Sequence, residues 1–190
     1  MNLPELKIGK LVAQVPIIQG GMAIRLSTAP LAAAVANEGG IGLIAASGMG
    51  LDELRKEIRM ARELTGGKGI IGINAMVAAR QFLDLITTAA EEGIDLIVAG
   101  AGFSRDIFAV GKKYGVEVVP IVSSARLAQT AEKLGASAVV VEGTEAGGHL
   151  GTQQSIKEIL PEVIEAVNIP VIAAGGAVDG NDVADLLKLG

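Results

Sequence analysis

The residues of this sequence that could do chemistry gather in one stretch, residues 139–151, which reads VVVEGTEAGGHLG. Its β-branched start predicts a buried strand, and glycines then surround His149, the only histidine in the chain. Glycine tolerates positive φ and has no Cβ, so the backbone can come close to a ligand. An imidazole titrates near neutral pH and can act as a general base. We therefore predict a ligand site that contains His149, rather than an ordinary surface loop.

Other apolar runs end in similar loops, which is why a plain glycine-rich turn is the weaker interpretation. These loops cover residues 19–22, 46–48, 74–76, 100–102, 123–124 and 175–176. Backbone N–H groups and small polar side chains with little charge suit a neutral, flat ligand that carries a phosphate tail. Gly175 and Gly176 precede a predicted helix, where N–H groups and the helix dipole stabilise phosphate.

Several chemistries are excluded by the residues that are missing. The sequence has no cysteine, which excludes disulfides, thiolate metal sites and a cysteine nucleophile. No lysine ends a predicted strand, which argues against a Schiff base. His149 with Glu142 and Glu145 makes a poor transition-metal set, so no metal is expected, and these carboxylates more commonly accept from loop N–H groups. An organic cofactor must therefore supply the reactivity.

The elements that position these loops alternate between strand and helix. Apolar runs predict strands over residues 15–19, 41–46, 69–76, 94–99, 116–122, 138–141 and 170–174. Capping residues and terminal glycines predict helices over residues 31–36, 52–64, 81–92, 106–114, 125–134, 155–167 and 183–189. Seven such βα units predict an α/β fold with a parallel sheet.

Two architectures fit this alternation, a (β/α)₈ TIM-type barrel and a doubly wound open sheet. No compact G-x-G-x-x-G fingerprint is present, and ligand-type loops recur after many strands, which favours the barrel. A barrel needs eight strands, so we predict a barrel truncated after the seventh βα unit. It would be a single domain over residues 1–190 that lacks the eighth strand. The alternative is an open seven-stranded sheet, complete as written.

The composition narrows the partners and the location. Half of the residues are apolar and the mean hydropathy is +0.50, but no apolar run approaches the ~20 residues of a membrane-spanning helix. The net charge of −5 and the lack of a basic cluster argue against nucleic acid. The N-terminus lacks the layout of a signal peptide. A cytoplasmic protein is expected, without a membrane partner, and a homodimer is compatible with the sequence.

Five segments together resemble the nitronate monooxygenase family, formerly called 2-nitropropane dioxygenase. They are PIIQGGM at 16–22, LAAAVANEGGIG at 31–42, GINAM at 72–76, EGTEAGGHLG at 142–151 and AAGG at 173–176. The resemblance covers essentially the whole chain. The flavin-dependent enoyl-acyl-carrier-protein reductase is a close relative with nearly the same motifs.

The resemblance implies an FMN-binding (β/α)₈ barrel and an active-site role for His149. With Ser123 added from the fifth loop, the candidate cofactor-binding residues are Gly21, Met22, Asn74, Ser123, Gly147, Gly148, Gly175 and Gly176. The implied activity is oxidation of alkyl nitronates or nitroalkanes with O₂ to carbonyl compounds and nitrite. The first alternative is an NAD(P)H-dependent FMN reductase of enoyl thioesters. The second alternative is a barrel fragment that binds FMN or phosphate without turnover.

Overall fold

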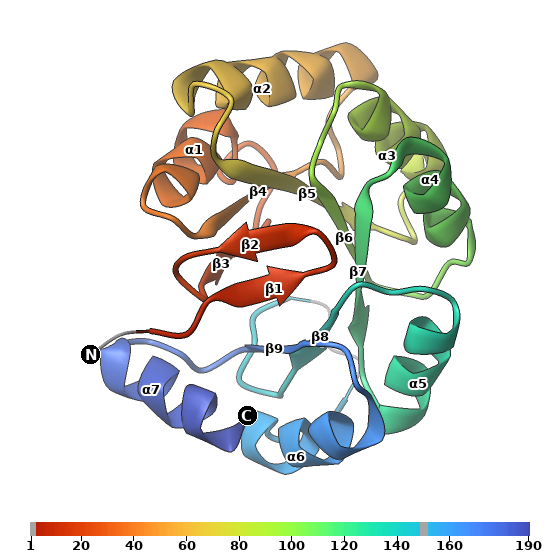
Figure 1. Cartoon of the computed structure of the whole chain (residues 1–190). Coiled ribbons are helices and arrows are strands. Elements are labelled where there is room, and N and C mark those ends of the chain that lie inside the picture. Colours follow the sequence, from red (N-terminus) through yellow and green to blue (C-terminus); the bar gives the residue numbers. More distant parts are fainter. Residues whose placement is uncertain (1–2, 149–151) are drawn as a thin grey trace. The chain divides into compact units, whose positions relative to one another are not determined.

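The computed structural model describes residues 3–148 and 152–190 of the chain (Figure 1). The chain divides into two compact units, one ending at Val118 and one running from Val119 to Gly190. Both units are built from parallel strands that alternate with helices.

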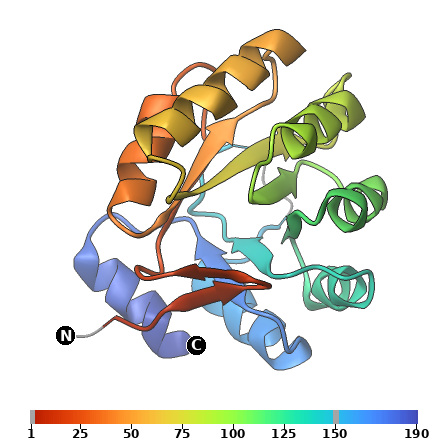
Figure 2. The ribbon, with the colours of Figure 1, turned by 45° about the horizontal axis from the view of Figure 1, so that its top comes forward.

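The first unit opens with an antiparallel hairpin, β1 (Leu6–Ile8) and β2 (Leu11–Ala13). Strands β3 to β6 then form a parallel sheet, each strand pairing with the next in the sequence. Helices α1 and α2 pack against each other beside this sheet, in orange and yellow in Figure 2. The remaining elements of this unit are β3 (Ile18–Gln19), α1 (Ala29–Asn37), β4 (Ile41–Ala45), α2 (Leu51–Leu64), β5 (Ile70–Met76), α3 (Phe82–Glu91), β6 (Leu96–Gly100), α4 (Asp106–Tyr114) and the first residues of β7 (Glu117–Val122).

The core of the first unit lies between its sheet and its helices. Every residue of β4 and of β6 is buried, as expected for strands covered on both faces. Helix α2 buries Leu54, Ile58 and Ala61 along one stripe, as its sequence periodicity predicts. Leu64, the last residue of the helix, is 49% exposed.

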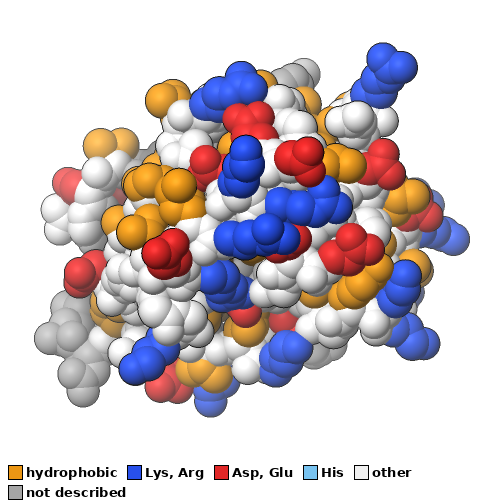
Figure 3. Space-filling model, turned by 90° about the horizontal axis from the view of Figure 1, so that it is seen from above, with side chains coloured by type: hydrophobic (Ala, Val, Ile, Leu, Met, Phe, Trp, Pro, Cys, Tyr) orange, Lys and Arg blue, Asp and Glu red, His pale blue; other side chains and the backbone are white. Residues whose placement is uncertain are grey.

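The outer side of α2 is charged, and Figure 3 shows Lys/Arg and Asp/Glu side chains interleaved on the face seen from that side. The Arg59 guanidinium donates to both carboxylate oxygens of Glu92, at 2.7 and 2.8 Å. Asp95 accepts from Arg62 and from the Ile71 N–H, both at 2.8 Å. These bonds tie the helix to the segment before β6 and to β5.

The second unit holds the end of β7 and the strands β8 (Val139–Glu142) and β9 (Val171–Ala174), which pair in parallel in that order. Its helices are α5 (Ala125–Lys133), α6 (Ile156–Ala166) and α7 (Gly180–Leu189). Their predicted caps are present: Ser124 accepts from Leu127, Ser155 forms a capping box with Glu158, and Asp179 caps α7.

Strand order distinguishes the two predicted architectures. In each unit the strands are neighbours in sequence order, β3 to β6 in one and β7 to β9 in the other. A doubly wound sheet reverses its strand order at a switch point, whereas a barrel does not. The order within each unit therefore favours the barrel.

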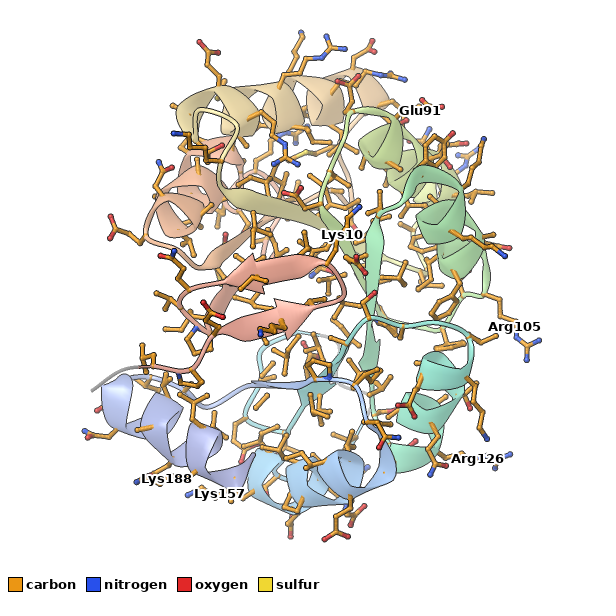
Figure 4. The ribbon with its side chains drawn as sticks, in the orientation of Figure 1. Lys10, Glu91, Arg105, Arg126, Lys157 and Lys188 are labelled. Carbon is orange, nitrogen blue, oxygen red and sulfur yellow. The ribbon has the colours of Figure 1, made fainter. Side chains whose placement is uncertain are left out.

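The N-terminal region differs from its prediction. The strand expected over residues 15–19 is wrong at its start, because Pro16 has no N–H and only Ile18–Gln19 pairs with β4. The hairpin β1–β2 was not expected. Its turn contains Gly9 in the left-handed region, with φ +55°. Lys10 follows it and lies beside the start of β7, where its ammonium donates to the Gly115 carbonyl (Figure 4).

Candidate functional site

In the first unit, the candidate site centres on Asn74, near the end of β5. Its amide nitrogen Nδ2 donates to the Gly21 carbonyl at 3.0 Å. A carbonyl oxygen can only accept, so this bond fixes which end of the carboxamide is oxygen. That oxygen, Oδ1, is buried and has no hydrogen-bond partner among the described residues. A buried acceptor without a donor is rare and costs about 1–3 kcal/mol, so Oδ1 points to a ligand N–H or O–H.

Gly21 is a glycine because its backbone lies directly against Asn74. A Cβ added at Gly21 would overlap the Cβ of Asn74, so a larger residue would push that side chain away. The structure thus brings Gly21 and Asn74 together, from the ends of β3 and β5.

The loop that follows β3 is held in place by Ser27, whose side chain is fully buried. The Ser27 hydroxyl accepts from the Met22 N–H at 3.0 Å and donates to the Gly20 carbonyl at 3.3 Å. The Ser27 carbonyl accepts from the Ala45 N–H at 2.8 Å, which fixes the loop to the end of β4. These bonds hold the backbone of Met22, while its side chain is 72% exposed.

In the second unit, the loop after β8 is anchored by Glu145. Its carboxylate accepts from the N–H of Ile156, the first residue of α6, at 3.0 Å. A carboxylate at a helix N-terminus is stabilised by the free N–H group and by the helix dipole. The Thr144 N–H also donates to the Gln154 carbonyl at 3.0 Å. The ordinary role expected for the loop carboxylates therefore holds for Glu145.

Gly175 and Gly176 bring the loop after β9 against the loop after β8. Both have left-handed φ, +99° and +76°. A Cβ on Gly175 would lie 2.7 Å from the Ala146 nitrogen, and one on Gly176 would lie 3.2 Å from the Glu145 Cβ. Only glycine allows both the turn and this close approach.

A Cβ on Gly147 or Gly148 would meet no atom of the described residues within 4 Å. Gly148 has φ +101°, so its backbone conformation requires glycine. Ser123 follows β7 and is half-buried. His149 lies outside the described residues, so its position at the site stays a prediction.

Two carboxylates occupy the N-terminus of α7, where the sequence suggested phosphate. Asp179 accepts from the N–H groups of Asn181 and Asp182, at 2.7 and 3.1 Å. Asp182 accepts from those of Val178 and Asp179, at 2.9 and 3.2 Å. The backbone N–H groups hold the pKa of Asp179 below its usual value. These four N–H groups already have acceptors within the protein, so they are not free to bind a phosphate.

Glu142 is the remaining carboxylate of this region. It ends β8, is half-buried and pairs in the ladder with Ala174. Burial raises the pKa of its carboxyl group, because the charged form loses solvation. The gathering of all these loops into one cavity stays a prediction, since each loop is described within its own unit.

Known proteins are similar to this chain over nearly its whole length. The model of the nitronate monooxygenase family matches residues 5–190. The chain belongs to the nitronate monooxygenase family. A relative in Rhodococcus jostii is 34% identical to this chain. The alignment covers 93% of this chain and 49% of the relative. The relative is named (3aS,4S,5R,7aS)-5-hydroxy-7a-methyl-1-oxo-octahydro-1H-indene-4-carboxyl-CoA dehydrogenase.

Two solved structures are similar to this family member. FabK from Thermotoga maritima has a TM-score of 0.87 and 39% identity, over 92% of this chain and 55% of its own. The nitroalkane oxidase of Streptomyces ansochromogenes has a TM-score of 0.84 and 28% identity, over 94% of this chain and 63% of its own. The predicted fold class, α/β of the TIM-barrel type, is confirmed.

This family member spans about half the length of the curated relatives it matches first, with 49% of each covered. Over the part that the structure describes, no helix is long and apolar enough to cross a membrane.

Proposed function

We propose that this protein is an FMN-dependent oxidoreductase that oxidises alkyl nitronates or nitroalkanes with O₂ to carbonyl compounds and nitrite. The observation that carries the proposal is the buried Asn74 Oδ1, an acceptor with no donor among the described residues. A flavin ring carries an N–H donor between two carbonyl groups, which fits such an acceptor. FMN supplies the redox chemistry when it is bound.

The residues around Asn74 would hold the ring end of FMN. Asn74 would accept from the ring N–H, while its own Nδ2 stays bonded to Gly21. Met22 would contribute its backbone, which Ser27 fixes, and an exposed thioether side chain. Family membership supports this assignment.

The glycines of the second unit would hold the phosphate end, with Ser123 as a further polar contact. The left-handed turn at Gly175 and Gly176 exposes consecutive backbone groups, a geometry that suits anions. No described residue lies within 4 Å of a Cβ placed on Gly147 or Gly148, so a ligand could approach their backbone closely. The carboxylates of Asp179 and Asp182 would keep the phosphate away from the first turn of α7.

His149 would act on the substrate. A nitronate is already an anion, so the protein needs little acid–base machinery to use it. His149 would orient it, stabilise its negative charge, or remove the α-proton of a neutral nitroalkane. An unperturbed imidazole has a pKa near ~6.5, which suits a base at neutral pH.

The test is His149→Ala, assayed by steady-state rates with neutral nitroalkane and with preformed nitronate. FMN absorbance should be unchanged, and turnover of the neutral form should fall by about 10²–10⁴, far more than that of the nitronate. Equal losses for both forms would remove the base role. Unchanged rates for both would remove His149 from the site.

A second candidate is NAD(P)H-dependent reduction of an enoyl thioester. One observation favours it: a relative is named as the dehydrogenase of a carboxyl-CoA compound, which is a thioester. Anaerobic mixing of the FMN-loaded protein with NADH, NADPH and a nitronate separates the candidates, because the true donor bleaches the flavin. If added FMN gives no flavin-bound protein, a domain without turnover is favoured. A single domain, a cytoplasmic location and a homodimer stay predictions from the sequence.

A further inference from the structure

The loop between β3 and α1 exposes three large apolar side chains within five residues. Met22 is 72% exposed, Ile24 is 53% exposed and Leu26 is 72% exposed. We call residues 22–26 the apolar loop. Single exposed apolar side chains are ordinary on a protein surface, but three neighbours beside a candidate site form a patch that could bind an apolar ligand.

The apolar loop is held firmly, so this exposure does not come from a loose segment. Arg25, within this loop, has φ +58°, a left-handed conformation that is unfavourable for a residue with a side chain. Its guanidinium donates to both oxygens of Glu53, at 2.9 and 3.2 Å. The N–H groups of Leu26 and Ser27 donate to the Ala23 carbonyl. The backbone is thus kept in a strained turn that directs apolar side chains outward.

The apolar loop continues directly from the candidate site of the first unit. It follows Gly21, whose carbonyl accepts from Asn74. It also reaches the end of β4, because a Cβ placed on Gly48 would lie 2.8 Å from the Ile24 Cδ1. The exposed side chains therefore begin where the buried, unpartnered Asn74 Oδ1 lies. An apolar ligand on this loop would be contiguous with a polar group bound at Asn74.

We propose that Met22, Ile24 and Leu26 form one wall of a subsite for the hydrocarbon chain of the substrate. The substrate would carry an alkyl or acyl chain of several carbons, with its polar end toward the flavin ring that Asn74 would hold. This rests on the proposed oxidoreductase function and names the substrate class within it. The relative that is named for a bicyclic carboxyl-CoA supports an apolar group of this size. The Arg25–Glu53 ion pair leaves no uncompensated charge on the wall.

The test measures binding rather than turnover, by calorimetric titration of the FMN-loaded protein with butyryl-, hexanoyl- and octanoyl-pantetheine. These saturated thioesters have neither a nitro group nor a carbon–carbon double bond, so neither candidate reaction consumes them. Full burial of a methylene group lowers the Kd about fourfold. Contact with one wall gives about half of the corresponding free energy, which lowers the Kd roughly twofold per methylene. The Kd should therefore fall about 15-fold from butyryl to octanoyl.

The test variant is Ile24→Gln with Leu26→Gln, and the single Leu26→Gln serves if the double variant misfolds. Both should reduce the 15-fold dependence on chain length to about threefold or less, while flavin absorbance stays unchanged. The matched control is Leu83→Gln on α3, a leucine with 50% exposure away from the loop, which should keep the full dependence.

Three outcomes would overturn the proposal. One is wild-type binding that does not depend on chain length, and another is an unchanged dependence in the Gln variants. The third is a change in oligomeric state or melting temperature of the variants with ligand binding unaffected, which would make the apolar loop a protein–protein contact. None of these depends on which redox reaction the protein performs, so the proposed function is tested separately.

Discussion

Replacing Asn74 by leucine separates ligand binding from folding. Leucine has the same branching as asparagine and a somewhat larger volume, and Asn74→Leu removes both polar atoms. Without FMN, two effects oppose each other. Loss of the 3.0 Å bond from Nδ2 leaves the Gly21 carbonyl unpaired, which destabilises by about 1–3 kcal/mol. Removal of the buried, unpartnered Oδ1 stabilises the folded state by about the same free energy, because an unsatisfied acceptor is no longer buried.

The net change in the free energy of unfolding without FMN should therefore stay within about 1 kcal/mol of zero. FMN binding should respond strongly, because a ring N–H would lose its acceptor. A donor left unsatisfied in a buried site costs about 1–3 kcal/mol, so the Kd for FMN should rise about 5- to 150-fold.

The assay is urea unfolding with and without saturating FMN, together with flavin titration by fluorescence quenching. Asn74→Asp is the matched control, because it keeps an acceptor at Oδ1 and loses the donor to Gly21. It should therefore weaken folding more than Asn74→Leu does. If Asn74→Leu destabilises the FMN-free protein by more than about 2 kcal/mol and leaves the FMN affinity unchanged, Asn74 serves the fold and not the ligand.

Two carboxylates of the second unit give further predictions. Burial raises the pKa of Glu142 above its value in the unfolded chain. The charged carboxylate therefore destabilises the folded state at high pH. This destabilisation disappears as the pH falls through the raised pKa and the group is protonated. Glu142→Gln should therefore increase the free energy of unfolding at pH 8, with the gain vanishing below pH ~4, as urea titrations at both pH values would show. Glu145→Ala should lower the free energy of unfolding by about 1 kcal/mol, because it removes the acceptor for the Ile156 N–H. Glu145→Gln keeps an acceptor oxygen and should lower it by less. Equal losses in the two variants would contradict a role for this hydrogen bond.

The helices could be predicted well because their ends carry local chemistry. Asp179 and Ser124 accept from N–H groups in the first turns of α7 and α5, and Gly115 ends α4 in the left-handed conformation. Such signals depend only on neighbouring residues, so the sequence alone contains them.

The hairpin β1–β2 could not be predicted from periodicity, since each strand has three residues. The signal that could have found it is Gly9-Lys10 between two short alternating segments. Gly21 and Asn74 both follow strands that end at the same edge of a parallel sheet. Their proximity could therefore be predicted from the sequence.

The contacts between loops could not be predicted from the sequence. The approach of Gly175 to Ala146 depends on the path of both loops, which no local pattern specifies. Asp179 was predicted as a helix cap, and the same N-terminus was predicted to bind phosphate. Both roles require the same N–H groups, and the structure assigns four of these to Asp179 and Asp182.

The bonds of Lys10 also determine when the N-terminus can fold during synthesis on the ribosome. The Lys10 N–H donates to Glu117, which is 107 residues further along the chain. Translation at about 5–20 residues per second delivers that partner roughly 5–20 s after the hairpin has been made. Until then β1 and β2 form an isolated two-stranded hairpin, which is marginally stable in water. The first segment of the first unit to be synthesised is therefore among the last to be fixed in place.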